Sequence, residues 1–197
     1  MTLRNWYLVI LCMLNFFVAA QAEVSLGKSV GTLPAVKTSE GKSVDWSSYE
    51  SKVMIFEWLN PDCPFVKRHY EEKTFQQLVG SLDESKVQWI GVNSTHYMSP
   101  EATEQWRQEQ GVSWPIIVDQ DGKFGRFFGA KTTPHIFVVA QDGSLLYQGA
   151  IDDDPYGKLQ PLNRKSNLAF LLSFAEQKET FKPFETQPYG CSVKYAD

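Results

Sequence analysis

The feature that most constrains this fold is an apolar run over residues 53–59 that leads into a cysteine. A nearly continuous apolar run of this length is typical of a central strand that is buried on both faces. The segment Asn60-Pro61-Asp62 ends the run, Cys63 follows, and Pro64 comes next. Proline is tolerated in the first turn of a helix. The sequence therefore predicts a strand that delivers Cys63 to the N-terminus of a helix.

A cysteine in this place is suited to act as a nucleophile. The backbone N–H groups and the partial positive charge of a helix N-terminus favour the thiolate, which is the reactive form of the side chain. A fall in the pKa from about 8.5 to about 6.5 raises the thiolate fraction at neutral pH from roughly 3% to roughly 75%. The alternative is an inert buried cysteine, and only the surrounding sequence distinguishes the two.

Residues 1–22 have the pattern of a secretory signal peptide. Arg4 supplies an early positive charge, an apolar run follows, and small residues come at the end. The apolar run is short for a membrane span, so we expect cleavage after Ala22, an exported protein that is periplasmic or secreted, and no stable membrane span in the mature chain. An uncleaved anchor is the alternative. Cys12 is lost with the signal, which leaves Cys63 and Cys191 in a compartment where disulfides persist.

The remaining residues, 23–197, are expected to form one domain with a C-terminal tail from about residue 179. The chain has 19 basic and 23 acidic side chains, a formal net charge of −4. None of its basic runs is dense enough to follow a phosphate backbone, so we expect no nucleic-acid partner.

Strand and helix patterns alternate along the first half of the domain. After a mixed lead-in and the first strand, apolar side chains at four-residue steps predict one amphipathic helix from Pro64 through Leu82. The next predicted elements are a strand over 87–93, a helix from Pro100 through about Gln110 that is capped by Ser99, a strand over 115–118 and a helical turn over 124–128. Such alternation implies right-handed crossovers and neighbouring parallel strands.

The second half changes to an antiparallel pattern. Strand-like runs over 134–140 and 144–149 are joined by Gln141-Asp142-Gly143, which is a strong hairpin signal. Apolar residues on one face over 168–178 predict a last helix. The sequence therefore predicts an α/β protein with a central mixed sheet and flanking helices.

Four segments stand out by their order and spacing: Asn60-Pro-Asp-Cys-Pro-Phe-Val-Lys-Arg-His-Tyr70, Thr133-Pro134, Gly149-Ala-Ile-Asp-Asp-Asp154 and Gly190-Cys-Ser-Val-Lys-Tyr195. Together they resemble the peroxiredoxin-like branch of the redoxin family, the alkyl hydroperoxide reductase and thiol-specific antioxidant proteins. The resemblance covers almost the whole mature chain. It implies a thioredoxin-like three-layer fold, a redox-active thiol, and antioxidant or oxidoreductase activity.

Two departures from the related families limit the chemistry. Thioredoxins carry Cys-x-x-Cys, whereas this chain has Cys63-Pro64-Phe65-Val66, so a dithiol mechanism inside the motif is impossible. Peroxiredoxins have a hydroxyl residue three positions before the peroxide-reactive cysteine, and here that position is Asn60. The full peroxidatic set of residues is therefore missing.

The resemblance also implies roles for single residues. Thr133-Pro134 matches a cis-proline that faces the active cysteine and leaves a backbone edge free for a substrate peptide. Pro64 and His135, which adjoin Cys63 and Pro134, complete the expected substrate-binding set. Glu57 lies six residues before Cys63, where thioredoxin-like enzymes carry a buried acid that exchanges protons with the cysteine. The alternative is that strand alternation turns Glu57 toward solvent.

Cys191 has three alternative roles: a resolving cysteine for Cys63, half of a structural disulfide, or an unpaired thiol. A structural bridge across so long a loop contributes about 5 kcal/mol in the chain-entropy description. We predict that Cys63 and Cys191 pair at some stage of the cycle.

Metal binding is the other function that these side chains could serve. Cys63, His69 and His135 offer ligands for copper or zinc, but their spacing matches no recognised site, so we expect no metal and no cofactor. The acidic run Asp152-Asp153-Asp154 lacks the spaced oxygen ligands of a calcium loop and is expected to be a solvated turn.

The sequence thus favours an exported thiol oxidoreductase. The Cys63 thiolate is expected to attack a disulfide or a peroxide, and Cys191 or an external thiol reductant resolves the intermediate. The expected partners are protein or small-molecule thiols, disulfides or peroxides. The alternative is a catalytically inactive thioredoxin-like module that binds peptides and holds a structural Cys63–Cys191 disulfide, and a copper-handling protein ranks third.

Overall fold

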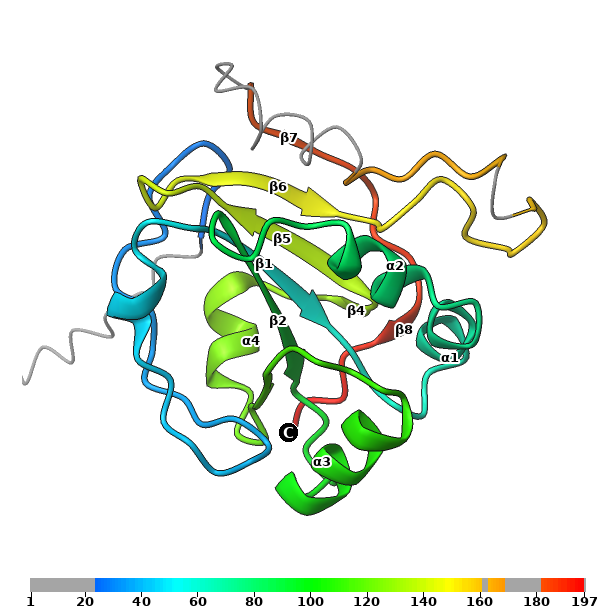
Figure 1. Ribbon diagram of the computed structural model, residues 1–197, viewed down its shortest axis with the longest axis horizontal. Helices are drawn as coiled ribbons and strands as arrows, with labels where there is room; N and C mark the ends of the chain where they lie inside the picture. Colours follow the sequence, from blue (N-terminus) through cyan, green and yellow to red (C-terminus); the bar gives the residue numbers. More distant parts are fainter. Residues whose placement is uncertain (1–23, 161–162, 169–181, 197) are drawn as a thin grey trace, which may run out of the picture.

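A mixed sheet organises the computed structural model, which describes residues 24–160, 163–168 and 182–196. Within these residues the large sheet has six strands in the order β3-β2-β1-β5-β6-β7 (Figure 1). Its strands are β1 (Val53–Trp58), β2 (Val87–Asn93), β3 (Ile116–Val118), β5 (His135–Val139), β6 (Leu145–Gly149) and β7 (Phe184–Glu185). β1, β2 and β3 are parallel, whereas β5 is antiparallel to both β1 and β6. The predicted parallel half and the predicted hairpin are both confirmed.

Helices flank both faces of this sheet. One face packs against α1 (Pro64–Glu71), α2 (Thr74–Gly80) and α3 (Pro100–Glu109), and the other against α4 (Lys123–Phe128) and the short helix η1 (Trp46–Tyr49). Ser99 caps α3 as predicted, because its Oγ accepts the Ala102 N–H at 3.1 Å. No helix among the described residues is both long enough and apolar enough to span a bilayer. The predicted signal peptide over 1–22 and most of the predicted last helix lie outside the described residues.

The central strand β1 is buried on both faces, as its apolar run predicts. Ile55 faces the α1 side, and Phe56 and Trp58 face the α4 side. The indole of Trp58 stacks on Phe124 of α4 with ring centroids 5.9 Å apart. These contacts leave Glu57 as the one polar side chain of β1, inside the core.

The prediction of a single helix from Pro64 through Leu82 is wrong. The chain forms α1 and α2 instead, with a break at Lys73, whose φ of 57° is left-handed. The break turns Phe75 inward, where it is fully buried and packs on Tyr70 with centroids 5.1 Å apart. Apolar spacing continues across the break, so the periodicity alone did not indicate it.

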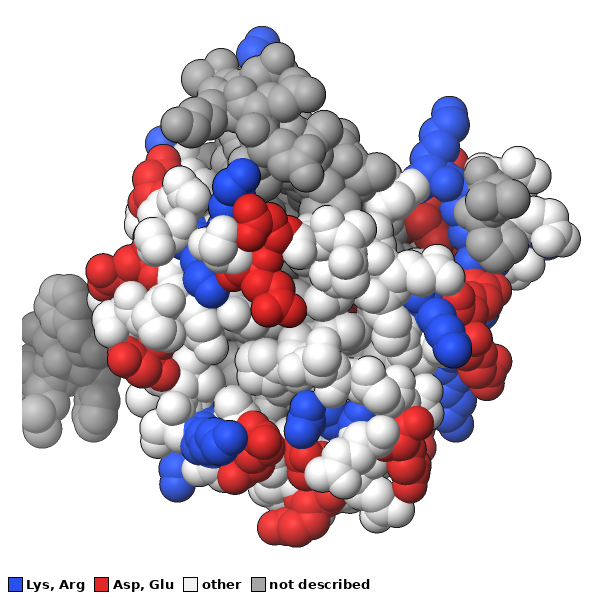
Figure 2. Space-filling view, in the orientation of Figure 1, with Lys and Arg blue, Asp and Glu red and all other residues white. Residues whose placement is uncertain are grey.

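The C-terminal tail contains two strands that the sequence did not predict. β7 extends the large sheet beside β6, and β8 (Cys191–Ser192) pairs antiparallel with β4 (Thr132–Thr133). In Figure 1 the red tail runs from the β6 edge, past α1, to the end of β4. On the face drawn in Figure 2, basic and acidic side chains are interspersed rather than gathered into one basic surface.

Candidate active site

The strand-to-helix junction places Cys63 at the start of α1. Cys63 is the N-cap residue with φ −74° and ψ 123°, and Pro64 follows inside the first turn. Proline suits that turn because its missing N–H has no partner there in any case. The Cys63 carbonyl accepts the Lys67 N–H at 2.9 Å, while the side chain is only 1% exposed. The predicted delivery of Cys63 to a helix N-terminus is confirmed.

The Cys63 sulfur lies between two predicted site residues. Its Sγ is 2.9 Å from the Sγ of Cys191 and 3.0 Å from the carbonyl oxygen of Thr133. Neither cysteine is in a disulfide. The fold therefore brings together Cys63, Cys191 and Thr133, which come from three distant parts of the chain.

The surroundings of the two sulfurs make them chemically unequal. Burial raises the pKa of the Cys63 thiol, but its hydrogen bonds with Cys191, with Thr133 and with the Val66 backbone N–H outweigh this effect, so the pKa lies below its ordinary value. The Val66 N–H is one of the free donors of the helix N-terminus. For Cys191, burial and the neighbouring Cys63 raise the pKa to about 11. Cys63 is therefore the more readily ionised thiol of the pair, and Cys191 is the one that keeps its proton to higher pH.

The Thr133-Pro134 peptide bond is cis, as the resemblance implies. The expectation that the adjoining backbone edge is free is wrong, because β8 occupies it with Cys191 opposite Thr133. His135 follows the proline and is 4% exposed. Its Nδ1 accepts the Lys131 N–H at 3.3 Å, and burial lowers its pKa to about 3, with the Lys131 charge adding to the effect. His135 is therefore a neutral packing residue, and its role in substrate binding stays a prediction.

Glu57 lies inside the core on the α1 side of the sheet, and not toward solvent. It is 0% exposed, and its carboxyl oxygens accept the Tyr70 hydroxyl at 2.9 and 3.1 Å and the Trp89 indole N–H at 3.0 Å. Burial raises its pKa from 4.5 to about 8, although the two hydrogen bonds act in the opposite direction. Glu57 therefore holds a proton at neutral pH that it can release near the pH at which a thiol titrates.

This proton predicts a pH dependence of stability. The folded chain binds the Glu57 proton up to about pH 8, whereas the unfolded chain releases it near pH 4.3. The free energy of unfolding therefore falls as the pH rises through this window. Glu57→Gln cannot ionise, so its stability relative to the parent chain is expected to rise by an amount on the order of 4 kcal/mol between about pH 4.5 and 8.5.

Urea unfolding at several pH values measures this difference. The exposed Glu84 provides the matched control, since Glu84→Gln is expected to keep the profile of the parent chain. Parallel profiles for Glu57→Gln and the parent chain would show that Glu57 is ionised in the folded state.

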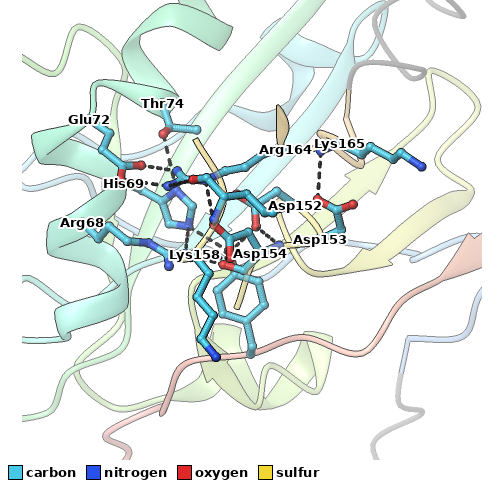
Figure 3. A network of polar contacts seen from close by, with 12 residues as sticks. Arg68, His69, Glu72, Thr74, Asp152, Asp153, Asp154, Lys158, Arg164 and Lys165 are labelled. Atoms are coloured by element: carbon cyan, nitrogen blue, oxygen red, sulfur yellow. Dashed lines mark hydrogen bonds and ion pairs between the residues drawn. The ribbon is translucent and has the colours of Figure 1, made fainter. Parts of the chain in front are cut away.

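The acidic run after β6 is not the solvated turn that the sequence predicts. Asp152 and Asp154 are each 4% exposed. Asp154 accepts the backbone N–H groups of Lys158 and Leu159 and the Nε–H of Arg164, at 2.9 to 3.0 Å. Arg164 also forms an ion pair with Glu72 near the end of α1 (Figure 3). These carboxylates therefore fix the loop after β6 to α1.

The same network reaches the tail through Tyr189, two residues before Cys191. The Tyr189 hydroxyl donates to Asp152 Oδ1 at 2.5 Å and lies 3.0 Å from His69 Nε2. Arg68 Nη2 donates to this hydroxyl at 3.3 Å and to the Asp154 carbonyl at 2.9 Å. Burial lowers the pKa of His69 to about 4, so its imidazole is neutral. No role for Tyr189 was predicted; its only sequence signal was an aromatic side chain two residues before Cys191.

The alternative metal ligands are not assembled. His69 belongs to the Tyr189 network, while His135 contacts Lys131 and Phe137. Across the part of the chain that the structure describes, no three His, Cys, Asp or Glu side chains gather as metal ligands.

The sheet topology, the cis-proline and the cysteine at a helix N-terminus define a thioredoxin-like protein with a cysteine pair. The chain belongs to the AhpC/TSA family, whose family model matches residues 32–148. The tail that carries Tyr189 and Cys191 lies beyond the matched segment. A search of curated proteins found no match.

Solved structures show the same fold. A hypothetical protein, SMc02350, from Sinorhizobium meliloti is 18% identical with a TM-score of 0.70, over 88% of this chain and 96% of that one. A thiol-disulfide isomerase from Corynebacterium glutamicum is 23% identical with a TM-score of 0.58, over 76% and 96% of the two chains. Peroxidoxin BcpB from Mycobacterium tuberculosis is 16% identical with a TM-score of 0.52, over 63% and 84%. The predicted thioredoxin-like fold is thus confirmed.

Proposed function

We propose that this protein is an exported thiol oxidoreductase in which Cys63 is the nucleophile and Cys191 the resolving cysteine. The observation that carries the proposal is the 2.9 Å separation of the two sulfurs at the N-terminus of α1. Their unequal surroundings support it, because the pKa of Cys63 is lowered whereas that of Cys191 is raised. Export rests on the signal-peptide pattern of residues 1–22.

With a disulfide R–S–S–R′ as substrate, the Cys63 thiolate attacks one sulfur, forms a mixed disulfide with R–S and releases R′–S⁻. This step removes the charge on Cys63 that raises the pKa of Cys191. Cys191 can then lose its proton, attack Cys63 Sγ, release R–S⁻ and close the Cys63–Cys191 disulfide. The substrate disulfide is thereby reduced by two electrons, and the protein is oxidised by two.

Thiol–disulfide exchange is a better fit than peroxide reduction. The position that carries a hydroxyl in peroxiredoxins is Asn60, and its Oδ1 accepts the Asp62 N–H at 2.8 Å. This side chain therefore shapes the turn before Cys63 and offers no hydroxyl to a peroxide. Peroxide reduction stays as the second reaction, in which Cys63 forms a sulfenic acid and Cys191 displaces water from it.

An external thiol is expected to regenerate the pair through Cys191. Cys191 is partly exposed, whereas Cys63 is 1% exposed, so the reductant reaches the Cys191 sulfur more easily. Attack there expels Cys63 as a thiolate, and a thiol of lower pKa is the faster leaving group. A second reductant thiol then frees Cys191.

The pH dependence of alkylation tests the proposal. In the reduced protein, the iodoacetamide reaction at Cys63 is expected to have its midpoint below the ordinary thiol value of about 8.5, and that at Cys191 well above it. The midpoint reports the pKa even if burial slows the reaction at every pH. A Cys63 midpoint at or above that of the denatured chain would exclude Cys63 as the activated thiol.

A further inference from the structure

The backbone edge beside Pro134 holds a strand of the same chain. In this pairing Thr133 lies opposite Cys191 and Thr132 opposite Ser192. The Val193 N–H extends the ladder by donating to the Lys131 carbonyl at 3.1 Å. Cys191 is presented to Cys63 from this strand, in the way that β-strand addition presents a bound peptide.

Gly190 fits the tail closely to this edge. Its φ is 131°, a conformation that side-chain-bearing residues rarely adopt. A Cβ atom at this position would lie 2.0 Å from the Thr133 carbonyl oxygen and 2.7 Å from the carbonyl carbon. Both atoms belong to the backbone of β4 and cannot move aside as a side chain can. The edge therefore accepts a strand only if glycine precedes the cysteine.

Two tyrosines hold the tail, one on each side of Cys191. On one side, the Tyr189 hydroxyl is bound to Asp152, His69 and Arg68. On the other, the Tyr195 hydroxyl donates to the Ala130 carbonyl at 2.9 Å, and the Arg126 guanidinium lies 4.5 Å from the ring centroid. The tail is thus built into the fold at both ends of β8 and is not a loose flap.

We propose that β8 is an internal ligand of a peptide-binding edge on β4 and that it keeps extended peptides away from Cys63. A peptide that replaces β8 must carry glycine immediately before the residue that lies opposite Thr133. The consequence for substrate access rests on the proposed function of Cys63. Occupancy of the edge by β8 is independent of that function, because peptide binding can be measured without any redox step. The partner that fits the vacated edge is an extended peptide with a Gly-Cys pair.

Tethering is expected to keep a free peptide from competing for this edge. A strand joined to the fold by a short linker has an effective concentration on the order of millimolar, so a micromolar peptide of the same sequence is excluded. Displacing the tethered strand by substitution is expected to raise the apparent affinity for the peptide by at least about tenfold.

Fluorescence anisotropy with a labelled peptide tests the proposal. The peptide has the sequence of residues 187–195 with serine in place of Cys191, and the protein is the full reduced chain. Gly190→Val should displace the tail and bind the peptide at least about tenfold more tightly than the parent chain. Ser192→Val is the matched control, because it introduces the same side chain at an exposed position of the same strand. A second peptide with valine in place of Gly190 should bind none of these proteins.

Hydrogen exchange of the Val193 amide reports independently whether the tail is docked. The amide is expected to be protected in the parent chain and in Ser192→Val, and to exchange freely in Gly190→Val. Equal peptide binding by all three chains would overturn the proposal. So would a folded Gly190→Val chain with an unprotected Val193 amide that binds no peptide.

If Gly190→Val does not fold, Tyr189→Phe provides the same comparison, because it removes the hydroxyl bound to Asp152 and keeps the ring. Its control is Tyr156→Phe, at a side chain that is 79% exposed. Tighter peptide binding by Tyr189→Phe alone supports the proposal, and equal binding by both overturns it. If the protein passes these tests but never forms a Cys63–Cys191 disulfide, the docking proposal stands and the proposed oxidoreductase function fails.

Discussion

Replacing Cys63 with serine is expected to lower the rate of thiol–disulfide exchange by roughly 1,000-fold or more. The hydroxyl of serine does not ionise near neutral pH, and no neighbouring base in the described site is placed to activate it. Cys191 does not substitute for it, because burial, the largest cause of its raised pKa, persists in the variant, and Cys191 is not at the helix N-terminus. Turnover of a small disulfide with an excess of external dithiol measures the loss.

The fold is expected to survive this substitution, since serine has nearly the same shape and its hydroxyl can donate to the Thr133 carbonyl as the Cys63 thiol does. Circular dichroism and thermal unfolding of Cys63→Ser provide the control. Activity within tenfold of the parent chain, in a protein that folds normally, would show that the nucleophile lies elsewhere.

Replacing Cys191 with serine is expected to stop the cycle after its first step. Cys63 still attacks the substrate, but the neighbouring sulfur that lies 2.9 Å away in the parent chain is gone. The mixed disulfide on Cys63 therefore accumulates, and steady-state turnover at micromolar external thiol falls by roughly 100-fold, because an intramolecular step becomes intermolecular. Intact-mass spectrometry shows the trapped species as one substrate thiol bound per chain.

A shifted thiol provides the control for this second variant. In the double variant Cys191→Ser with Ser192→Cys, the thiol moves by one residue along β8 and so points to the opposite face of the strand. It is expected to trap the mixed disulfide as Cys191→Ser does. Normal turnover by the double variant would mean that any thiol on the tail suffices, and that the register of β8 has no role.

The parts of the fold that rest on local sequence were predictable. The apolar run of β1, its stop at Asn60, and Pro64 in the first turn of α1 each act within a few residues, so the sequence alone placed Cys63 correctly. The hairpin of β5 and β6 was predictable for the same reason, because the link Gln141-Asp142-Gly143 sets the turn.

The parts that were missed depend on partners far away in the chain. Asp152 and Asp154 look like solvated carboxylates until Tyr189 and Arg164 are brought beside them. The pairing of the tail with β4 depends on the absence of a side chain at Gly190, which no periodicity expresses. Distant partners of this kind are supplied by the tertiary fold and not by local pattern.

Glu57 lies between these two cases. A single acid inside an apolar strand was a visible signal, but strand alternation left its direction open. Tyr70 on α1 and Trp89 on β2 settle it, because both donate to the carboxyl group inside the core. The sequence thus located the candidate acid, the contacts with two other elements fixed its direction, and burial raises its pKa.

The central claim is that Cys63 and Cys191 form one redox pair. Mass spectrometric disulfide mapping of the reduced full chain, after one equivalent of a small disulfide, tests it most directly. If the two cysteines form one redox pair, the intact mass falls by two hydrogen atoms, and a single cross-linked peptide pair joins Cys63 to Cys191. A chain in which Cys63 carries the substrate thiol or stays unmodified, while Cys191 remains open to alkylation, would contradict it.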